Sequence, residues 1–263
     1  MKYKAIATDL DGTLLNDEKQ ISEVNRKAID YAVSKGVIII PCTGRAVQGI
    51  TRFEALRKLN SLAVAYNGGM ITNLKDGSTV YHCPLTENDA RFIINSGLEF
   101  DTNICVWIDN KLFCNKINKY TLEYSKISNI PPVKFDSFSH ISDRIITKVL
   151  WYDDELRIQS FLTNMRKSVS PLVTCCTSKP WFLEFFNSRT SKSLALEKIC
   201  EFYGINLSEV IAVGDELNDI SMLKAAGLSV AVENAVDELK IQADIITASN
   251  NDNGFSKLVY DFF

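Results

Sequence analysis

The sequence has no block of basic residues and no long apolar run. Its 263 residues include 29 Lys and Arg against 32 Asp and Glu, a net charge of −3, so a surface that neutralises nucleic-acid phosphates is not expected. Apolar runs such as Val37–Ile40 are far too short to span a bilayer, and residues 1–4 lead into a strand-like segment rather than a signal peptide. These absences predict a cytoplasmic protein that binds neither nucleic acid nor membranes.

The few cysteines and histidines exclude further kinds of site. The seven cysteines are odd in number and lack Cys-x-x-Cys spacing, so neither a disulfide framework nor a zinc site is expected. The two histidines, His82 and His140, fall at or inside a central region that differs from the rest of the chain. Gly-x-Ser-x-Gly and Gly-x-x-x-x-Gly-Lys motifs are absent. A Ser-His-Asp or Cys-His hydrolase is therefore disfavoured.

The first quarter of the chain alternates between strand and helix patterns. Apolar residues after Ser22 recur at helical spacing, and Gly36 stands where a helix would end. The predicted elements are strands at 5–9, 37–40 and 62–66 and helices at 22–36 and 46–59. This βαβαβ order predicts parallel strands with right-handed crossovers and a ligand site at their carboxyl ends.

The middle of the chain has another pattern, and a length of 263 residues suits about two domains. A hairpin that turns at Asp76-Gly77 leads to residues 85–187, which mix helices and strands as an α+β insert, and from Ser191 the βα alternation returns. The further predicted elements are a hairpin at 104–114 about Asp109-Asn110, helices at 87–95, 154–167, 191–203 and 219–226, strands at 210–213 and near 228 and 245, and a last helix after a polar turn at 250–254. Residues 1–84 and 188–263 are thus expected to form one discontinuous α/β core.

Four polar loops follow core strands or begin a neighbouring helix. They are Asp9-Leu10-Asp11-Gly12-Thr13, Thr43-Gly44-Arg45, Lys192 at a helix start, and Gly214-Asp215-Glu216-Leu217-Asn218-Asp219. Taken singly, each has an ordinary explanation as a turn, a solvated lysine or a helix cap. Their occurrence in this order at the strand ends makes chance agreement improbable.

This conjunction resembles the haloacid dehalogenase superfamily of phosphohydrolases, whose four motifs match these loops. The long insert, the segment Asn67-Gly68-Gly69 and the tail Asn250–Gly254 look like the Cof-type group, which has a large α+β cap. The resemblance covers essentially the whole chain. It implies a Rossmann-like α/β core with a parallel sheet and a cap at residues 85–187 that closes over the substrate and selects it.

The resemblance also implies a role for each matching residue. Asp9 is expected to be the nucleophile that forms an aspartyl phosphate, and Asp11 the acid and base that serves the leaving oxygen and the water. A Mg²⁺ ion is expected on Asp9, the backbone carbonyl of Asp11 and Asp215, with Asp219 beside them. The residues expected to bind the phosphoryl group are Leu10, Thr43, Gly44, Lys192 and Asn218, with Arg45 helping at the rim.

The expected activity is the hydrolysis of a small phosphorylated metabolite, such as a sugar phosphate or a phosphorylated cofactor, by a monomer or small homo-oligomer. Two alternatives stay open at this stage. A phosphomutase would use the same aspartyl phosphate and form an isomer instead of free phosphate. A phospho-aspartate receiver or binding regulator would keep a long-lived phosphoryl group on Asp9, although Asp11 and the large insert favour turnover.

Overall fold

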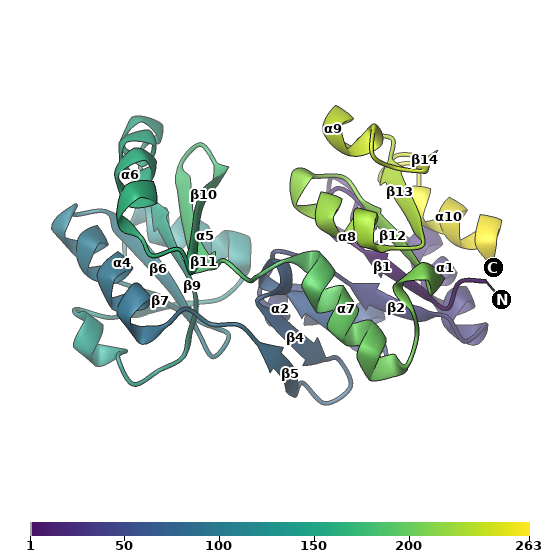
Figure 1. The fold of residues 1–263 in the computed structure, drawn as a ribbon, viewed down its shortest axis with the longest axis horizontal. Coiled ribbons are helices and arrows are strands. Elements are labelled where there is room, and N and C mark those ends of the chain that lie inside the picture. The colour runs from purple at the N-terminus through teal and green to yellow at the C-terminus, as the bar shows by residue number, and fades with distance from the viewer. Residues whose placement is uncertain (1) are drawn as a thin grey trace. The chain divides into compact units, whose positions relative to one another are not determined.

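The chain is described by a computed structural model over residues 2–263 and divides into two compact units (Figure 1). Unit 1 comprises the residues up to Tyr81 together with Ser191–Phe263, and unit 2 comprises His82–Thr190. The predicted insert, 85–187, lies inside unit 2, which also includes residues 82–84 and 188–190. Across residues 2–263, no helix is long and apolar enough to cross a membrane.

Unit 1 is built on a parallel five-stranded sheet in the order β14-β13-β12-β1-β2. Its strands are β1 (Ala5–Thr8), β2 (Ile38–Pro41), β12 (Val210–Gly214), β13 (Leu228–Val232) and β14 (Ile245–Thr247). The β1, β12 and β13 strands are buried at every residue, as expected for short apolar runs covered on both faces. Next to β2, a single parallel bridge between Cys42 and Val64 adds β3 (Leu62–Ala65), which continues into an antiparallel sheet with β4 (Met70–Asn73) and β5 (Thr79–His82).

Helices cover both faces of this sheet. They are α1 (Glu23–Ser34), α7 (Lys192–Tyr203), α8 (Ile220–Ala225), α9 (Asp237–Lys240) and α10 (Gly254–Phe262). The connections β1-α1-β2 and β12-α8-β13 run in opposite directions across the sheet, so right-handed crossovers put α1 and α8 on opposite faces. The α1 helix packs against α10, and α7 packs against α8. The predicted N-cap Ser22 accepts a backbone hydrogen bond at the start of α1, and Ser191 does the same at the start of α7.

The single helix predicted over 46–59 is wrong. The segment forms two short helices, α2 (Val47–Thr51) and α3 (Glu54–Arg57), separated by extended backbone at Phe53. The Phe53 ring lies under two guanidinium groups, 5.6 Å from that of Arg45 and 5.3 Å from that of Arg52. The ring of the residue at the break is thus packed against both arginines, each contact being worth about 0.5–1 kcal/mol at an exposed site.

Unit 2 contains a six-stranded sheet in the order β10-β11-β9-β6-β7-β8, antiparallel except between β7 and β8. Its elements are α4 (Glu87–Glu99), β6 (Asn103–Ile108), β7 (Lys111–Cys114), α5 (Lys119–Ser128), β8 (Pro132–Lys134), β9 (Ile146–Tyr152), α6 (Glu155–Ser168), β10 (Val173–Lys179) and β11 (Phe182–Asn187). Asp109 and Asn110 make the predicted tight turn, both with positive φ. A core centred on Trp151 joins the sheet to α4 and α6. The unit is therefore α+β, as predicted.

Candidate active site

Three loops of unit 1 begin where neighbouring parallel strands end. In the sheet, Thr8 of β1 pairs with Val213 of β12 on one side and with Pro41 of β2 on the other. The Asp9 amide also donates to the Val213 carbonyl at 3.0 Å, which keeps Asp9 at the end of the ladder. Because parallel strands end on the same edge, the loops after Thr8, Pro41 and Gly214 converge there.

Asp9, Asp215 and Asp219 form a buried cluster of carboxylates at this edge. One oxygen of each lies within 4.8 Å of the others, and the residues are 6%, 8% and 0% exposed, respectively. The amides of Asp215 and Glu216 donate to Asp219 Oδ2 at 3.1 and 3.2 Å, and the Thr13 hydroxyl donates to Asp215 Oδ1 at 2.7 Å. These bonds fix the carboxylates before any ligand binds.

Lys192 places its ammonium group between two of these carboxylates. It is the first residue of α7, where Ser191 caps the helix by accepting from the Leu194 amide. Lys192 Nζ lies 2.5 Å from Asp9 Oδ1 and 2.6 Å from Asp219 Oδ1, and the lysine side chain has no solvent exposure. A lysine at a helix start, which taken singly suggests a solvated surface group, is thus the buried counter-charge of the cluster.

The pKa values of the cluster show a surplus of negative charge. Burial raises the pKa of Asp9 well above its ordinary value; the charge of Lys192 opposes this shift, and Asp219 and Asp215 add to it. Burial also raises the pKa of Asp215 to about 7, against the Thr13 hydrogen bond and with the help of the Asp219 charge. Burial works to lower the pKa of Lys192, yet Asp9 and Asp219 raise it overall. Three carboxylates share one ammonium group, so full ionisation calls for a further cation.

The donor set fits a hard divalent cation. Carboxylate oxygens are the ligands that Mg²⁺ prefers, and the group of Asp9, Asp215 and Asp219 could hold such an ion. Gly12 leaves the space beside Asp215 open: it has φ +80°, and a Cβ at this position would lie 2.3 Å from Asp215 Oδ2. A side chain at residue 12 would therefore displace one of the carboxylates.

Asp11 is held by Arg45 rather than by the carboxylate cluster. Arg45 Nε donates to Asp11 Oδ2 at 2.6 Å and Nη2 donates to Oδ1 at 2.7 Å, a two-pronged ion pair that Lys19 joins at 3.4 Å. Burial works to raise the pKa of Asp11, but the hydrogen bonds and charge of Arg45, together with Lys19, outweigh it and hold this pKa below its ordinary value. Arg45, predicted only as a helper at the rim, thus keeps Asp11 ionised.

The predicted phosphate loop packs against an asparagine that the site prediction omitted. Thr43 is buried, and its hydroxyl accepts from the Arg45 amide at 3.2 Å. A Cβ at Gly44 would lie 3.1 Å from both side-chain polar atoms of Asn67, and Asn67 Oδ1 accepts from Asn218 Nδ2 at 3.0 Å. The sequence signal for Asn67 was its position directly after the third strand, where polar residues of this fold face the ligand edge.

The loop after Asp9 is held from outside by two more asparagines. The Leu10 carbonyl accepts from the Leu15 amide at 2.8 Å, which curls the loop back on itself. Asn234 Nδ2 donates to the Gly12 carbonyl at 2.7 Å, Asn250 Nδ2 donates to the Leu15 carbonyl at 3.0 Å, and the Asn250 amide donates to Asn234 Oδ1 at 2.9 Å. Asn234 had no local sequence signal, whereas Asn250 begins the polar turn noted in the tail.

The structure thus sorts the predicted site residues into three neighbouring groups. Asp9, Lys192, Asp215 and Asp219 form the buried cluster; Asp11 pairs with Arg45; and Thr43, Gly44 and Asn218 gather around Asn67. The Asp11 side chain is not part of the cluster, and the prediction of a metal ligand there concerns its backbone carbonyl. His82 and His140 both belong to unit 2, where His82 Nε2 lies 2.9 Å from the Thr147 hydroxyl.

Comparisons with known proteins agree over nearly the full length of the chain. The sequence model of the haloacid dehalogenase-like hydrolases matches residues 6–259. A Bacillus subtilis (strain 168) protein named "Putative phosphatase YxeH" is 32% identical over 267 residues, covering 98% of each chain. The 5-amino-6-(5-phospho-D-ribitylamino)uracil phosphatase YcsE of the same organism is also 32% identical, covering 97% of this chain and 94% of its own.

The fold is also similar to that of a solved structure over nearly the full length of the chain. The crystal structure of a haloacid dehalogenase-like hydrolase from Bacteroides thetaiotaomicron superposes with a TM-score of 0.93 at 26% sequence identity, covering 99% of this chain and 100% of the other. The similarity therefore includes both units of the chain, not only the parallel-sheet core.

Proposed function

Because the chain belongs to the haloacid dehalogenase-like hydrolases, we propose that it is a Mg²⁺-dependent phosphatase of small phosphomonoesters that works through a phosphoryl group on Asp9. The observation that carries the proposal is the pairing of Asp9 with the buried ammonium group of Lys192, beside two further fixed carboxylates. Burial raises the pKa of Asp9, so positive charge nearby has to keep its carboxylate ionised; once ionised it needs no base to activate it, and the same positive charge lets a phosphate approach.

The first half-reaction transfers the phosphoryl group to Asp9. A free carboxylate oxygen of Asp9 attacks phosphorus, the bond from phosphorus to the ester oxygen breaks, and that oxygen takes a proton as the alcohol leaves. The Lys192 ammonium and the Thr43 and Gly44 loop stabilise the charge that spreads over the phosphoryl oxygens. When bound, Mg²⁺ would be held by Asp9, Asp215 and the Asp11 carbonyl, with Asp219 beside them, and would supply the charge that brings the two anions together.

Asp11 supplies and then recovers the proton, and Arg45 decides when it can. Both oxygens of Asp11 are engaged by the Arg45 guanidinium. A protonated Asp11 has lost the charge that makes this two-pronged pair strong, so Asp11 can protonate the leaving oxygen once substrate draws Arg45 away. In the second half-reaction, Asp11 takes a proton from the water that attacks phosphorus, and free phosphate leaves with the Asp9 carboxylate restored.

Unit 2 is proposed to select the leaving group. The core loops bind only the phosphoryl group, which is the same in every monoester, so discrimination has to come from what covers the remainder of the substrate. The proposed boundaries of this cap are residues 85 and 187. The substrate class is small phosphorylated metabolites, either sugar phosphates or phosphorylated cofactors, in line with the substrate printed for the YcsE relative.

Phosphate release from a panel of monoesters tests the proposal. We expect p-nitrophenyl phosphate and at least one of the sugar phosphates, pyridoxal phosphate or flavin mononucleotide to be hydrolysed with Mg²⁺ and not after treatment with a chelator. Asp9→Asn is the matched control, since it keeps the shape of the side chain and removes the nucleophile. Formation of an isomer without free phosphate would indicate a phosphomutase, and a long-lived phosphoryl-Asp9 without turnover would indicate a receiver.

A further inference from the structure

The turn that follows β3 has three successive residues with positive φ. Tyr66, Asn67 and Gly68 have φ values of 52°, 57° and 105°. This region is disfavoured for residues with a Cβ, and for a bulky aromatic residue such as Tyr66 in particular. Such strained residues persist only where the surrounding structure imposes them, and they gather at functional sites.

Two catalytic segments impose this conformation. On one side, the Tyr66 amide donates to the Arg45 carbonyl and the Asn67 amide donates to the Thr43 carbonyl, both at 2.9 Å. On the other side, Gly68 lies against the start of α7, where a Cβ would come within 2.1 Å of the Ser191 carbonyl oxygen. The turn is therefore wedged between the phosphate loop and the helix start that carries Lys192.

The Asn67 side chain adds a third connection. It packs on the bare Cα of Gly44, and its Oδ1 accepts one of the two Nδ2 protons of Asn218. The second Nδ2 proton of Asn218 and its Oδ1 remain for a ligand. Without Asn67, the Asn218 side chain, which is exposed, would be free to rotate away from the loop.

We propose that Asn67 is a positioning residue of the phosphoryl site, which acts by holding the Asn218 amide and the Gly44 backbone in place before substrate binds. The inference rests on the proposed phosphatase function and adds a residue to its machinery. Donors that are already oriented need no reorganisation when charge develops on the phosphoryl oxygens, and this lowers the barrier. Asparagine suits the position because it tolerates the left-handed region better than other residues with a side chain.

A double-mutant cycle with p-nitrophenyl phosphate tests the coupling. Asn67→Gly keeps the positive φ and removes only the side chain, and Asn218→Ala removes the group through which Asn67 acts. We expect Asn67→Gly to lower kcat/KM about tenfold in the wild-type background, as for loss of one well-placed hydrogen bond. In the Asn218→Ala background it should lower kcat/KM by a clearly smaller factor, about threefold or less, because the hydrogen-bond partner is already gone and only the packing on Gly44 is then lost.

Asn129→Gly is the matched control. Asn129 also has positive φ, at the C-terminal end of α5, and the same substitution there should leave both the kinetics and Tm unchanged. If Asn67→Gly lowers kcat/KM by the same factor in both backgrounds, Asn67 does not act through Asn218 and the inference is overturned. A wild-type protein that does not hydrolyse p-nitrophenyl phosphate at all would overturn the proposed function, and the inference with it.

A second variant covers the case in which Asn67→Gly does not fold. Asn67→Asp keeps the shape, the tolerance of positive φ and the acceptor for Asn218, but it places a negative charge against Gly44. Inhibition of turnover by inorganic phosphate should weaken about tenfold or more, since like charges would then meet at the phosphoryl site. An unchanged inhibition constant for phosphate would show that Asn67 does not border this site.

Discussion

Lys192→Met removes the buried ammonium group of the active site and keeps a side chain of similar length and an apolar stem. The side chains of Lys192, Asp9 and Asp219 are 0%, 8% and 0% exposed, so water does not screen their interaction. Removal of one partner of a buried ion pair leaves an uncompensated charge and costs about 3–5 kcal/mol of folding free energy. For a protein of this size, that loss lowers Tm by roughly 6–20 °C.

The pH and metal dependence of this variant follow from the same charges. Burial opposes but does not prevent the rise of the Lys192 pKa caused by Asp9 and Asp219, so the lysine is charged in the wild type at neutral pH and its contribution is complete there. The metal-free variant keeps three crowded carboxylates and no counter-charge. A divalent cation should therefore stabilise it more than it stabilises the wild type.

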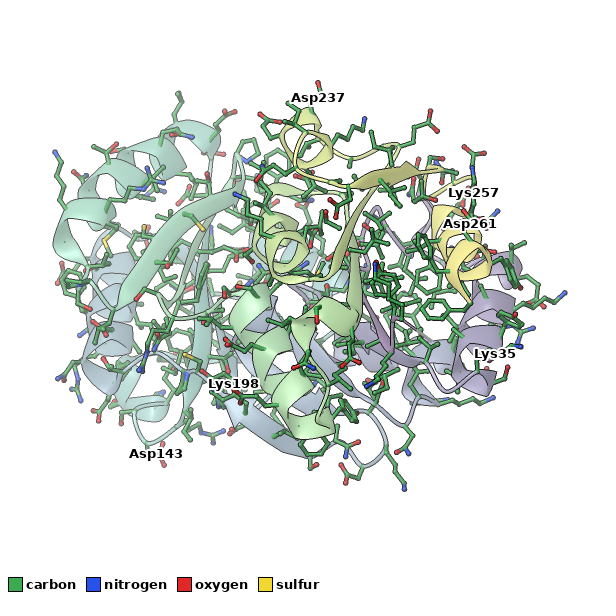
Figure 2. All side chains as sticks on the ribbon, turned by 45° about the vertical axis from the view of Figure 1, so that its right-hand side comes forward. Lys35, Asp143, Lys198, Asp237, Lys257 and Asp261 are labelled. Atoms are coloured by element: carbon green, nitrogen blue, oxygen red, sulfur yellow. The ribbon has the colours of Figure 1, made fainter. Side chains whose placement is uncertain are left out.

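Thermal unfolding followed by far-UV circular dichroism, in chelator and in excess Mg²⁺, measures both effects. Lys198→Met is the control: Lys198 lies on the same helix, α7, and is exposed at the surface (Figure 2), where loss of its contact with the Tyr81 ring, 4.8 Å from the ring centroid, is worth about 0.5–1 kcal/mol. A Tm of the metal-free Lys192→Met variant within about 2 °C of the Lys198→Met value would refute the assignment of Lys192 as the counter-charge of the cluster.

Three further variants test the remaining parts of the site. Asp215→Asn should raise Tm in chelator at pH 8 and abolish the Mg²⁺-induced rise, because burial raises the pKa of Asp215 to about 7. The free energy of unfolding of the metal-free wild type should fall, by roughly 3 kcal/mol from this group, as pH rises from about 4 to about 7, and that of the variant should fall less. Asp9→Asn should lose more than about 10³-fold in kcat and show no phosphoryl group by mass spectrometry after brief exposure to substrate; phosphate on another residue of the wild type would contradict the assignment. Arg45→Met should move the alkaline limb of the kcat/KM profile to higher pH, since Asp11 must be protonated to serve the leaving oxygen and Arg45 holds its pKa down against the effect of burial; an unmoved limb would show that the ion pair does not govern Asp11.

The sequence predicted the parts of the site that follow from strand order. Apolar runs at 5–8 and 210–213 identify buried strands. Parallel pairing of Thr8 with Val213 then brings Asp9 and Asp215 to the same edge of the sheet, independently of the other elements. The predicted cap Ser22 forms for a similarly local reason, because a hydroxyl directly before an apolar helical pattern satisfies a free amide. These features follow from short local sequence patterns and from the rule that parallel strands of one sheet end at the same edge.

The rest of the site depends on contacts between segments far apart in the chain. The burial of Lys192 arises only when α7 is placed against Asp9, 183 residues away, and nothing in Arg189–Ser193 distinguishes it from a surface lysine. The ion pair between Arg45 and Asp11 likewise joins two loops that each have an ordinary local explanation. The α5 helix was missed because its cap, Asn118, is followed by Lys119, Tyr120 and Thr121, a polar start with weak helical periodicity.

The departures from local rules in unit 1 meet at one edge of its sheet, and this supports a functional reason for them. Burial, with the help of the Asp219 charge, raises the pKa of Asp215 to about 7, and Tyr66 and Asn67 adopt positive φ beside the loop at residues 43–45. Each feature destabilises the empty protein, so selection for stability alone would remove it. A bound cation would relieve the first, and the hydrogen bonds that the Asn67 and Tyr66 amides donate to the Thr43 and Arg45 carbonyls maintain the second. Under the proposed function, the stability given up at this edge is the cost of orienting the groups expected to bind phosphate before substrate arrives.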